Sequence, residues 1–153
     1  MATIALQRAR CISPAQVLYF PEAASQSFKN GEFVYLVSGK LTVFPSDGVA
    51  IAGMALQDAS TVTDTAIAIQ VARPGVVFEG NVSTSVTAIT QVGTKYGIVR
   101  DGTNKWHHVD VSDTTNTRVV VVDMSPKDDV GDTYGRIYFE VLDEYCQIGA
   151  TTS

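Results

Sequence analysis

The sequence predicts an all-β protein, and two observations carry this prediction. Segments rich in Val, Ile, Ala and Phe recur along the chain, roughly five to eight residues at a time, and each is closed by Gly, Asp, Ser or Pro. The run from Gly31 to Asn81 contains no helical stretch and no evident catalytic group. Short strands with such frequent turns are typical of a small barrel or sandwich.

The first group of strands lies in residues 28–81. Residues 33–37 and 40–44 are separated by Ser38-Gly39, a two-residue turn that predicts a hairpin. Turn residues recur at 45–48 and 73–75, where Pro presets the backbone and Gly accepts a positive φ. Further strands of this group are expected at residues 49–57, 65–72 and 76–82, with a polar loop at 58–64. Gly53, inside one of these strands, predicts a bulge or a close backbone contact.

The second group follows a polar, Thr-rich stretch. Its expected strands are residues 96–100, 105–111, 119–123 and 133–142, with a hairpin loop at 101–104. The continuous apolar run at 119–123 predicts a central strand that is buried on both faces. In 133–142, Ile137 and Phe139 are offset from Tyr138 and Glu140, so this strand is expected to bury one face.

The N-terminal 27 residues differ in composition from the rest. They contain Arg8 and Arg10, a single acidic residue and two prolines, and no period of 2 or 3.6 runs through them. We therefore expect an extended arm. Segments that stay free in solution are poor in large apolar residues, so the group Leu18, Tyr19 and Phe20 favours docking onto another surface.

Length and charge restrict the class of protein. A chain of 153 residues is long enough for one domain with its own core. The net charge of −5 and the pI near 4.8 argue against a general nucleic-acid binder. No apolar run reaches the roughly 20 residues of a membrane span, and the N-terminus lacks secretory-signal features, so synthesis in a cytoplasm is expected. We expect the chain to divide into an extended arm at 1–27, a single β-rich domain at 28–148 and a flexible tail at 149–153.

Candidate metal ligands are few. His107 and His108 are adjacent on an expected strand, so their side chains point to opposite faces and do not easily chelate one metal. We expect them to be surface or half-buried histidines near Trp106. A group of aspartates is most simply a solvated turn, with a weak cation site between subunits as the minor alternative: Asp128, Asp129 and Asp132.

Candidate nucleophiles are equally few. Cys11 and Cys146 lie near opposite ends of the chain and are expected to be two reduced thiols, with a disulfide that ties the termini as the alternative. There is no Gly-rich phosphate loop and no G-x-S-x-G motif. The residues therefore predict no catalytic, cofactor-binding or metal site.

Four short segments carry a resemblance to a known family. Together with the strands around them they cover about half to two-thirds of the chain, and they resemble, in order, the head decoration (cement) proteins of tailed bacteriophages. These segments are Gly31-Glu32-Phe33-Val34, Ala52-Gly53-Met54-Ala55-Leu56, Ala72-Arg73-Pro74-Gly75-Val76-Val77-Phe78-Glu79 and Gly93-Thr94-Lys95-Tyr96-Gly97.

The resemblance implies a β-tulip-like barrel or sandwich and a structural role rather than an enzymatic one. It implies a virion protein on the exterior of the capsid, made in the host cytoplasm, that stabilises the expanded icosahedral head by bridging neighbouring capsomers. The implied partners are the major capsid protein and further copies of the chain in a homotrimer, with no nucleic acid, membrane or cofactor. We expect the arm to contact the capsid or the next subunit through Arg8, Arg10, Leu18, Tyr19 and Phe20. Deleting residues 1–20 should then abolish head binding and leave the fold intact.

Two alternatives to this function stay open. One is another virion module, such as a head fibre, a tail component or a host-surface-binding domain. A fibre more often shows repeats or a coiled coil, and this sequence has neither. The other is a small β-barrel hydrolase or a cupin-like metal enzyme. That class needs a converging His and Glu cluster, whereas here Glu79 and Glu140 are isolated in sequence from the two histidines.

Overall fold

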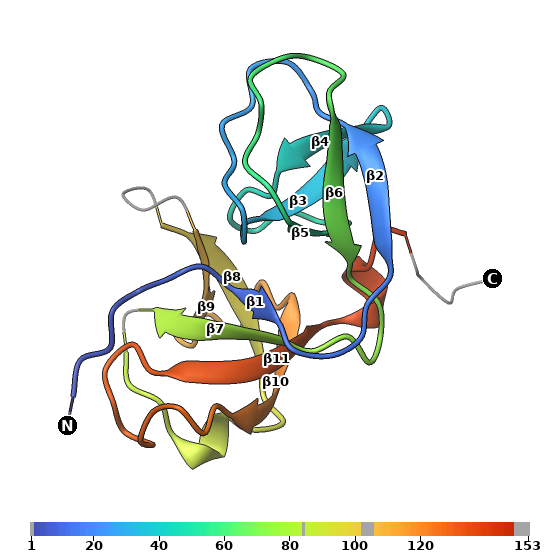
Figure 1. Ribbon diagram of the computed structural model, residues 1–153. Coiled ribbons are helices and arrows are strands. Elements are labelled where there is room, and N and C mark those ends of the chain that lie inside the picture. The colour runs from blue at the N-terminus through green and yellow to red at the C-terminus, as the bar shows by residue number, and fades with distance from the viewer. Residues whose placement is uncertain (1, 84, 102–105, 149–153) are drawn as a thin grey trace.

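The computed structural model describes residues 2–83, 85–101 and 106–148 and confirms the predicted all-β fold. Eleven strands and two short 3-10 helices fall within these ranges. The strands form two sheets, one above the other in Figure 1. Within the same ranges, no helix has the length and apolar character needed to cross a membrane. The tail expected at 149–153, and positions 102–104 of the expected hairpin loop, lie outside the described residues.

The lower sheet in Figure 1 closes into a small barrel. Its order is β1-β7-β11-β10-β8-β9, and a parallel pairing between β9 and β7 completes the ring. Strand β1 pairs with the part of the β7 edge that β9 leaves free. The strands are β1 (Arg10–Cys11), β7 (Phe78–Ser83), β8 (Lys95–Arg100), β9 (His107–Asp110), β10 (Val119–Met124) and β11 (Arg136–Val141), with η1 (Ile89–Gln91) before β8 and η2 (Asp143–Tyr145) after β11.

The upper sheet has five strands in the order β2-β6-β5-β3-β4. They are β2 (Val17–Pro21), β3 (Phe33–Val37), β4 (Lys40–Val43), β5 (Gly53–Ala55) and β6 (Ala66–Val71). The sheet curls, because a bridge between Glu22 and Leu41 joins its two edge strands. Its concave face encloses a separate apolar cluster that includes Phe28, Ile67 and Ile69.

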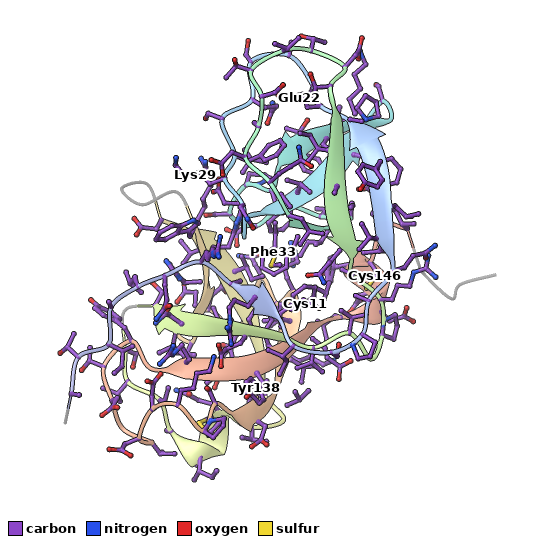
Figure 2. The ribbon with its side chains drawn as sticks, viewed as in Figure 1. Cys11, Glu22, Lys29, Phe33, Tyr138 and Cys146 are labelled. Atoms are coloured by element: carbon purple, nitrogen blue, oxygen red, sulfur yellow. The ribbon has the colours of Figure 1, made fainter. Side chains whose placement is uncertain are left out.

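A shared core joins the barrel to the five-stranded sheet. Phe33 and Met54 of the sheet belong to the same buried cluster as Phe78 and Phe139 of the barrel. The rings of Phe33 and Phe78 meet edge to face, with centroids 5.1 Å apart. Figure 2 shows Phe33 at the junction of the two sheets. Burial of apolar surface therefore holds the two sheets together as well as each sheet by itself.

Polar contacts reinforce this junction. Arg100 of the barrel donates to both carboxylate oxygens of Glu32, from Nε at 2.7 Å and from Nη2 at 3.4 Å, and Glu32 is fully buried. Arg118 donates to the backbone carbonyls of Asp47 and Gly48, and its guanidinium lies 4.2 Å from the centre of the Tyr145 ring. These cations supply donors to backbone and carboxylate acceptors that are buried at the junction.

Local predictions from turns and alternation are confirmed. The hairpin of β3 and β4 turns at Ser38 and Gly39, whose φ angles of 51° and 79° are those of a two-residue type I′ turn. A Cβ atom at Gly53 would lie 2.1 Å from the Gln70 carbonyl oxygen, which confirms the close backbone contact. Strand β11 buries Ile137 and Phe139 and leaves Tyr138 half-buried.

The prediction that residues 119–123 are buried on both faces is wrong. In β10, Val119 and Val121 are buried, whereas Val120 and Val122 are only half-buried and Asp123 is exposed. The reason is the barrel, which gives each strand one face toward the core and one face outward. Valine on the outward face fits a pleated strand without requiring full burial.

The extended N-terminal arm is not confirmed. Residues 10–11 and 17–21 form β1 and β2, and Ala9 is buried in the shared core. Before them, Thr3 forms a parallel bridge with Thr133. In Figure 1 this N-terminal stretch follows the barrel along β7 and then crosses to the five-stranded sheet. The missing sequence period reflects a segment that changes from one sheet to the other within a few residues.

Candidate interaction surface

Buried polar side chains of the barrel hold the N-terminal strap, defined here as residues 2–12. The Asn81 side chain accepts a hydrogen bond from the Gln7 backbone N–H at 3.0 Å and donates one to the Ala5 carbonyl at 3.1 Å. Asp132 accepts from the Ala2 N–H at 3.1 Å. Both side chains bond to the backbone of the strap, so these particular contacts do not depend on the side chains of the strap.

Arg10 is tied to the barrel through Glu79, which is 3% exposed. Three donors meet this carboxylate: Arg10 Nη2 at 3.2 Å, Lys127 Nζ at 3.0 Å and Ser125 Oγ at 2.7 Å. Burial alone raises the pKa of Glu79, but the hydrogen bonds from Ser125 and Lys127 and the charges of Lys127 and Arg10 hold that pKa below its ordinary value. Arg10 is therefore engaged within the molecule although its side chain is 53% exposed, and Arg8 is also exposed.

The residues of β2 divide between two faces. Leu18 and Phe20 point inward and pack against the apolar cluster of the five-stranded sheet. Tyr19 and Val17 point outward and are 66% and 44% exposed. We call these two side chains the outer β2 face. The residue paired with Tyr19 on β6 is Ala68, whose small side chain leaves the aromatic ring uncovered.

A second exposed apolar group lies on the barrel. A bridge from Val86 to Thr133, and a hydrogen bond from the Gly131 N–H to Thr87 Oγ1 at 3.0 Å, bring the loops before β8 and before β11 together. Figure 1 places this region at the end of the barrel away from the five-stranded sheet. We call its exposed aliphatic residues the barrel-end patch: Val86, Ile89, Val92 and Val130.

The histidines are not where the sequence placed them. The expectation of surface or half-buried side chains is wrong, because His107 and His108 are both buried. His107 makes two hydrogen bonds to the backbone of the five-stranded sheet. His108 lies 3.9 Å from Asp101 Oδ2, and burial lowers its pKa against the attraction of that carboxylate. In residues 2–83, 85–101 and 106–148, no group of three His, Cys, Asp or Glu side chains is placed to hold a metal ion.

The aspartates of residues 128–132 have structural partners. Asp128 accepts two hydrogen bonds of 2.7 Å from the Arg136 guanidinium, and these bonds hold the pKa of Asp128 below its ordinary value despite burial. Asp132 is buried and accepts from the Asp129 N–H at 3.0 Å. The expected solvated turn is therefore wrong for Asp128 and Asp132, which organise the loop beside the strap.

Both cysteines are free thiols. Cys146 is buried, and burial together with Asp143 and Glu140 raises the pKa of its thiol to about 11. A thiol with so high a pKa is a poor nucleophile at neutral pH. It packs in the shared core.

Sequence reasoning missed the buried polar residues that organise the strap and the junction. A signal was present in β7, where Glu79 and Asn81 alternate with Phe78 and Val82. That alternation is compatible with a solvated outer face, but the strap and the loop between β10 and β11 cover these residues. Protein-family models and curated proteins offer no match to this chain. No pocket is found among the described residues. The outer β2 face and the barrel-end patch are therefore the candidate interaction surfaces of the molecule.

Proposed function

We propose that this protein is a structural virion protein that decorates the expanded icosahedral head of a tailed bacteriophage and stabilises it by bridging neighbouring capsomers. The observation that carries the proposal is the outer β2 face, an exposed tyrosine and valine held on a paired strand. Tyrosine is enriched at protein interfaces, because it offers a large contact area with few rotatable bonds and a polar tip. The resemblance of four sequence segments to head decoration proteins is the reason that we propose the major capsid protein as the partner.

Bridging needs two contact surfaces on one rigid body. The outer β2 face lies on the five-stranded sheet, and the barrel-end patch lies on the barrel. The shared core and the ion pair between Glu32 and Arg100 join these two parts. A preorganised bridge loses little conformational freedom on binding, so more of each contact contributes to affinity.

Weak individual contacts suffice for such a role. A homotrimer engages several capsid subunits at once, and its effective concentration at the second and third sites multiplies the affinity of the first. Preference for the expanded head follows if the complementary site forms only in the mature lattice, since a ligand shifts toward the state that it binds better. The major capsid protein and neighbouring copies of this chain are the proposed partners.

The structure narrows the set of contact residues that we propose. Leu18 and Phe20 pack inward and Arg10 binds Glu79, so these three support the strand and the strap. Tyr19, Arg8 and Arg10 are exposed, and Arg10 keeps 53% of its side-chain surface exposed although it binds Glu79. We therefore assign the direct capsid or subunit contact to Tyr19, with Arg8 as a further, cationic contact on the strap.

The test is co-sedimentation of the purified protein with expanded and unexpanded heads that lack it. We expect saturable binding to expanded heads only, and at least about a tenfold loss of affinity for Tyr19→Lys, because a charge replaces an interface aromatic. Val62→Lys is the matched control, since Val62 is 63% exposed on the loop before β6 and lies outside both apolar groups. Absence of binding to either head form, or equal loss in the two variants, would contradict the proposal.

A further inference from the structure

His107 joins the barrel to the five-stranded sheet through both of its ring nitrogens. The backbone N–H of Phe33, at the start of β3, donates to Nδ1 at 3.1 Å. Nε2 donates to the Phe44 carbonyl, just beyond β4, at 2.7 Å. One side chain on β9 thus satisfies a donor and an acceptor at the barrel end of the neighbouring hairpin.

These two bonds define the protonation state of the ring. Nδ1 must carry a lone pair to accept from Phe33, and Nε2 must carry the proton to donate to Phe44. A second proton would occupy Nδ1 and place two N–H groups against each other. The ring is 1% exposed and lies between the rings of Phe33 and Phe44, at centroid distances of 5.7 and 5.9 Å, so no water can take over the lost bond without opening the junction.

The surrounding charges also oppose a charged His107. Arg100, which pairs with His107 across β8 and β9, is a permanent cation, and His108 follows on the same strand. The carboxylate of Glu32, from the segment before β3, is already bound by Arg100 and by the Lys29 N–H at 2.7 Å. The Asp101 carboxylate lies next to His108, with its Oδ2 3.9 Å from His108 Nε2.

We propose that His107 is an acid-sensitive link that holds the barrel and the five-stranded sheet together only while its ring is neutral. Burial is the main cause that lowers the pKa of His107 from 6.5 to about 3 in the folded protein. Because the folded pKa is depressed, the contribution of His107 to stability is complete above pH 6.5 and is lost as the pH falls toward 3. These two pKa values imply that the folding equilibrium constant falls about 30-fold between pH 7.5 and pH 5. The link is independent of the proposed capsid role.

Urea unfolding of the full chain at pH 7.5 and pH 5 tests the link. Trp106 is the single tryptophan and directly precedes β9, so its fluorescence reports on this junction, with far-UV circular dichroism as the second probe. Gln has an acceptor and a donor but no charge, so we expect His107→Gln to remove most of the 30-fold fall. His108→Gln is the matched control, since it leaves both bonds of His107 in place and should retain the fall that depends on His107. An unchanged pH dependence in His107→Gln would overturn the proposal.

A direct measurement covers the case in which His107→Gln does not fold. The nitrogen-15 chemical shifts of the imidazole rings distinguish a neutral ring with its proton on Nε2 from a charged ring. We expect His107 in the folded wild-type protein to stay in that neutral form down to about pH 4. Titration of the folded-state ring near pH 6.5, or a proton on Nδ1 at neutral pH, would refute the link.

Discussion

At the scale of single residues, the fold depends on buried carboxylates that are fully partnered. Glu22 is buried and accepts from the backbone N–H groups of Ser60 and Thr61, so it organises the loop before β6. Glu32 binds Arg100, and Glu79 binds the strap through Arg10. A buried carboxylate without such partners would cost several kcal/mol, so each of these glutamates restricts how its neighbouring segment can be arranged.

Glu79→Gln tests whether a buried and partnered carboxylate stabilises the fold. We expect a loss of about 1–3 kcal/mol in the free energy of unfolding at pH 7, because the amide weakens the bonds to Arg10 and Lys127. The folded pKa of Glu79 is below its ordinary 4.5, so its ionic contribution is present above pH 4.5 and declines as the pH falls below that value. Chemical denaturation across pH 3–7 should show that the free energy of unfolding falls less with pH in Glu79→Gln than in the wild type. The exposed Glu144→Gln is the control, and an equal effect there would contradict the assignment.

At the scale of elements, the strap and β2 contribute to the stability of the fold in different ways. The strap is held mainly through backbone hydrogen bonds to Asn81 and Asp132, and only Ala9 within it is buried in the core. Strand β2 instead contributes Leu18 and Phe20 to the cluster inside the five-stranded sheet. Deleting residues 1–20 therefore removes β1 and most of β2, so the expectation that such a truncation leaves the fold intact does not suit this architecture.

Two truncations separate the contribution of the first part of the strap from that of β2. Deletion of residues 1–8 keeps β1 and β2 and should leave a folded protein that has lost about 2 kcal/mol of stability, which lowers the melting temperature by roughly 4–8 °C. Deletion of residues 1–20 should abolish cooperative unfolding, because it exposes the cluster around Ile67 and Ile69. Differential scanning calorimetry of both proteins is the measurement. A cooperative transition in the longer truncation would show that β2 is dispensable for folding.

At the scale of the whole molecule, two small sheets behave as one body because their junction combines apolar burial with polar links. Phe33, Phe78 and Phe139 supply the apolar part. His107 and the pair of Glu32 with Arg100 supply directional contacts that a purely apolar interface lacks. In the proposed capsid role, force between the two ends of the molecule would pass through this junction.

A mutant cycle at Glu32 and Arg100 measures the junction. Arg100→Met leaves the buried carboxylate of Glu32 without its charged partner and should cost about 3–5 kcal/mol, whereas Glu32→Gln should cost less, because Arg100 is 24% exposed and can reach water. The double variant should be more stable than Arg100→Met alone. Lys40→Met, which breaks the exposed pair with Asp64, is the control and should cost about 1 kcal/mol or less. Equal costs at the two pairs in urea unfolding would show that the junction does not depend on this ion pair.

Local patterns predicted much of the fold and little of the interaction surface. Ser38-Gly39 identified the hairpin, and the alternation around Ile137 predicted the buried face of β11, because turns and pleats depend on neighbouring residues. The sequence groups Tyr19 with Leu18 and Phe20 as contact residues, yet Tyr19 points to the outer face of β2 and the other two point inward. Which of the three faces outward depends on how β2 pairs with β6, and the sequence alone does not show that pairing.

By itself, the sequence determined that this chain folds into short strands, where most of its turns lie, and which strands present one apolar face. Only the tertiary structure decided that residues 10–11 and 17–21 belong to two different sheets, that both histidines are buried, and that Glu32 binds Arg100. The physical reason is separation along the chain: His107 and Phe33 are 74 residues apart, and Glu32 and Arg100 are 68 apart. Strand period and turn chemistry are local, whereas burial of a polar group depends on which distant segment covers it.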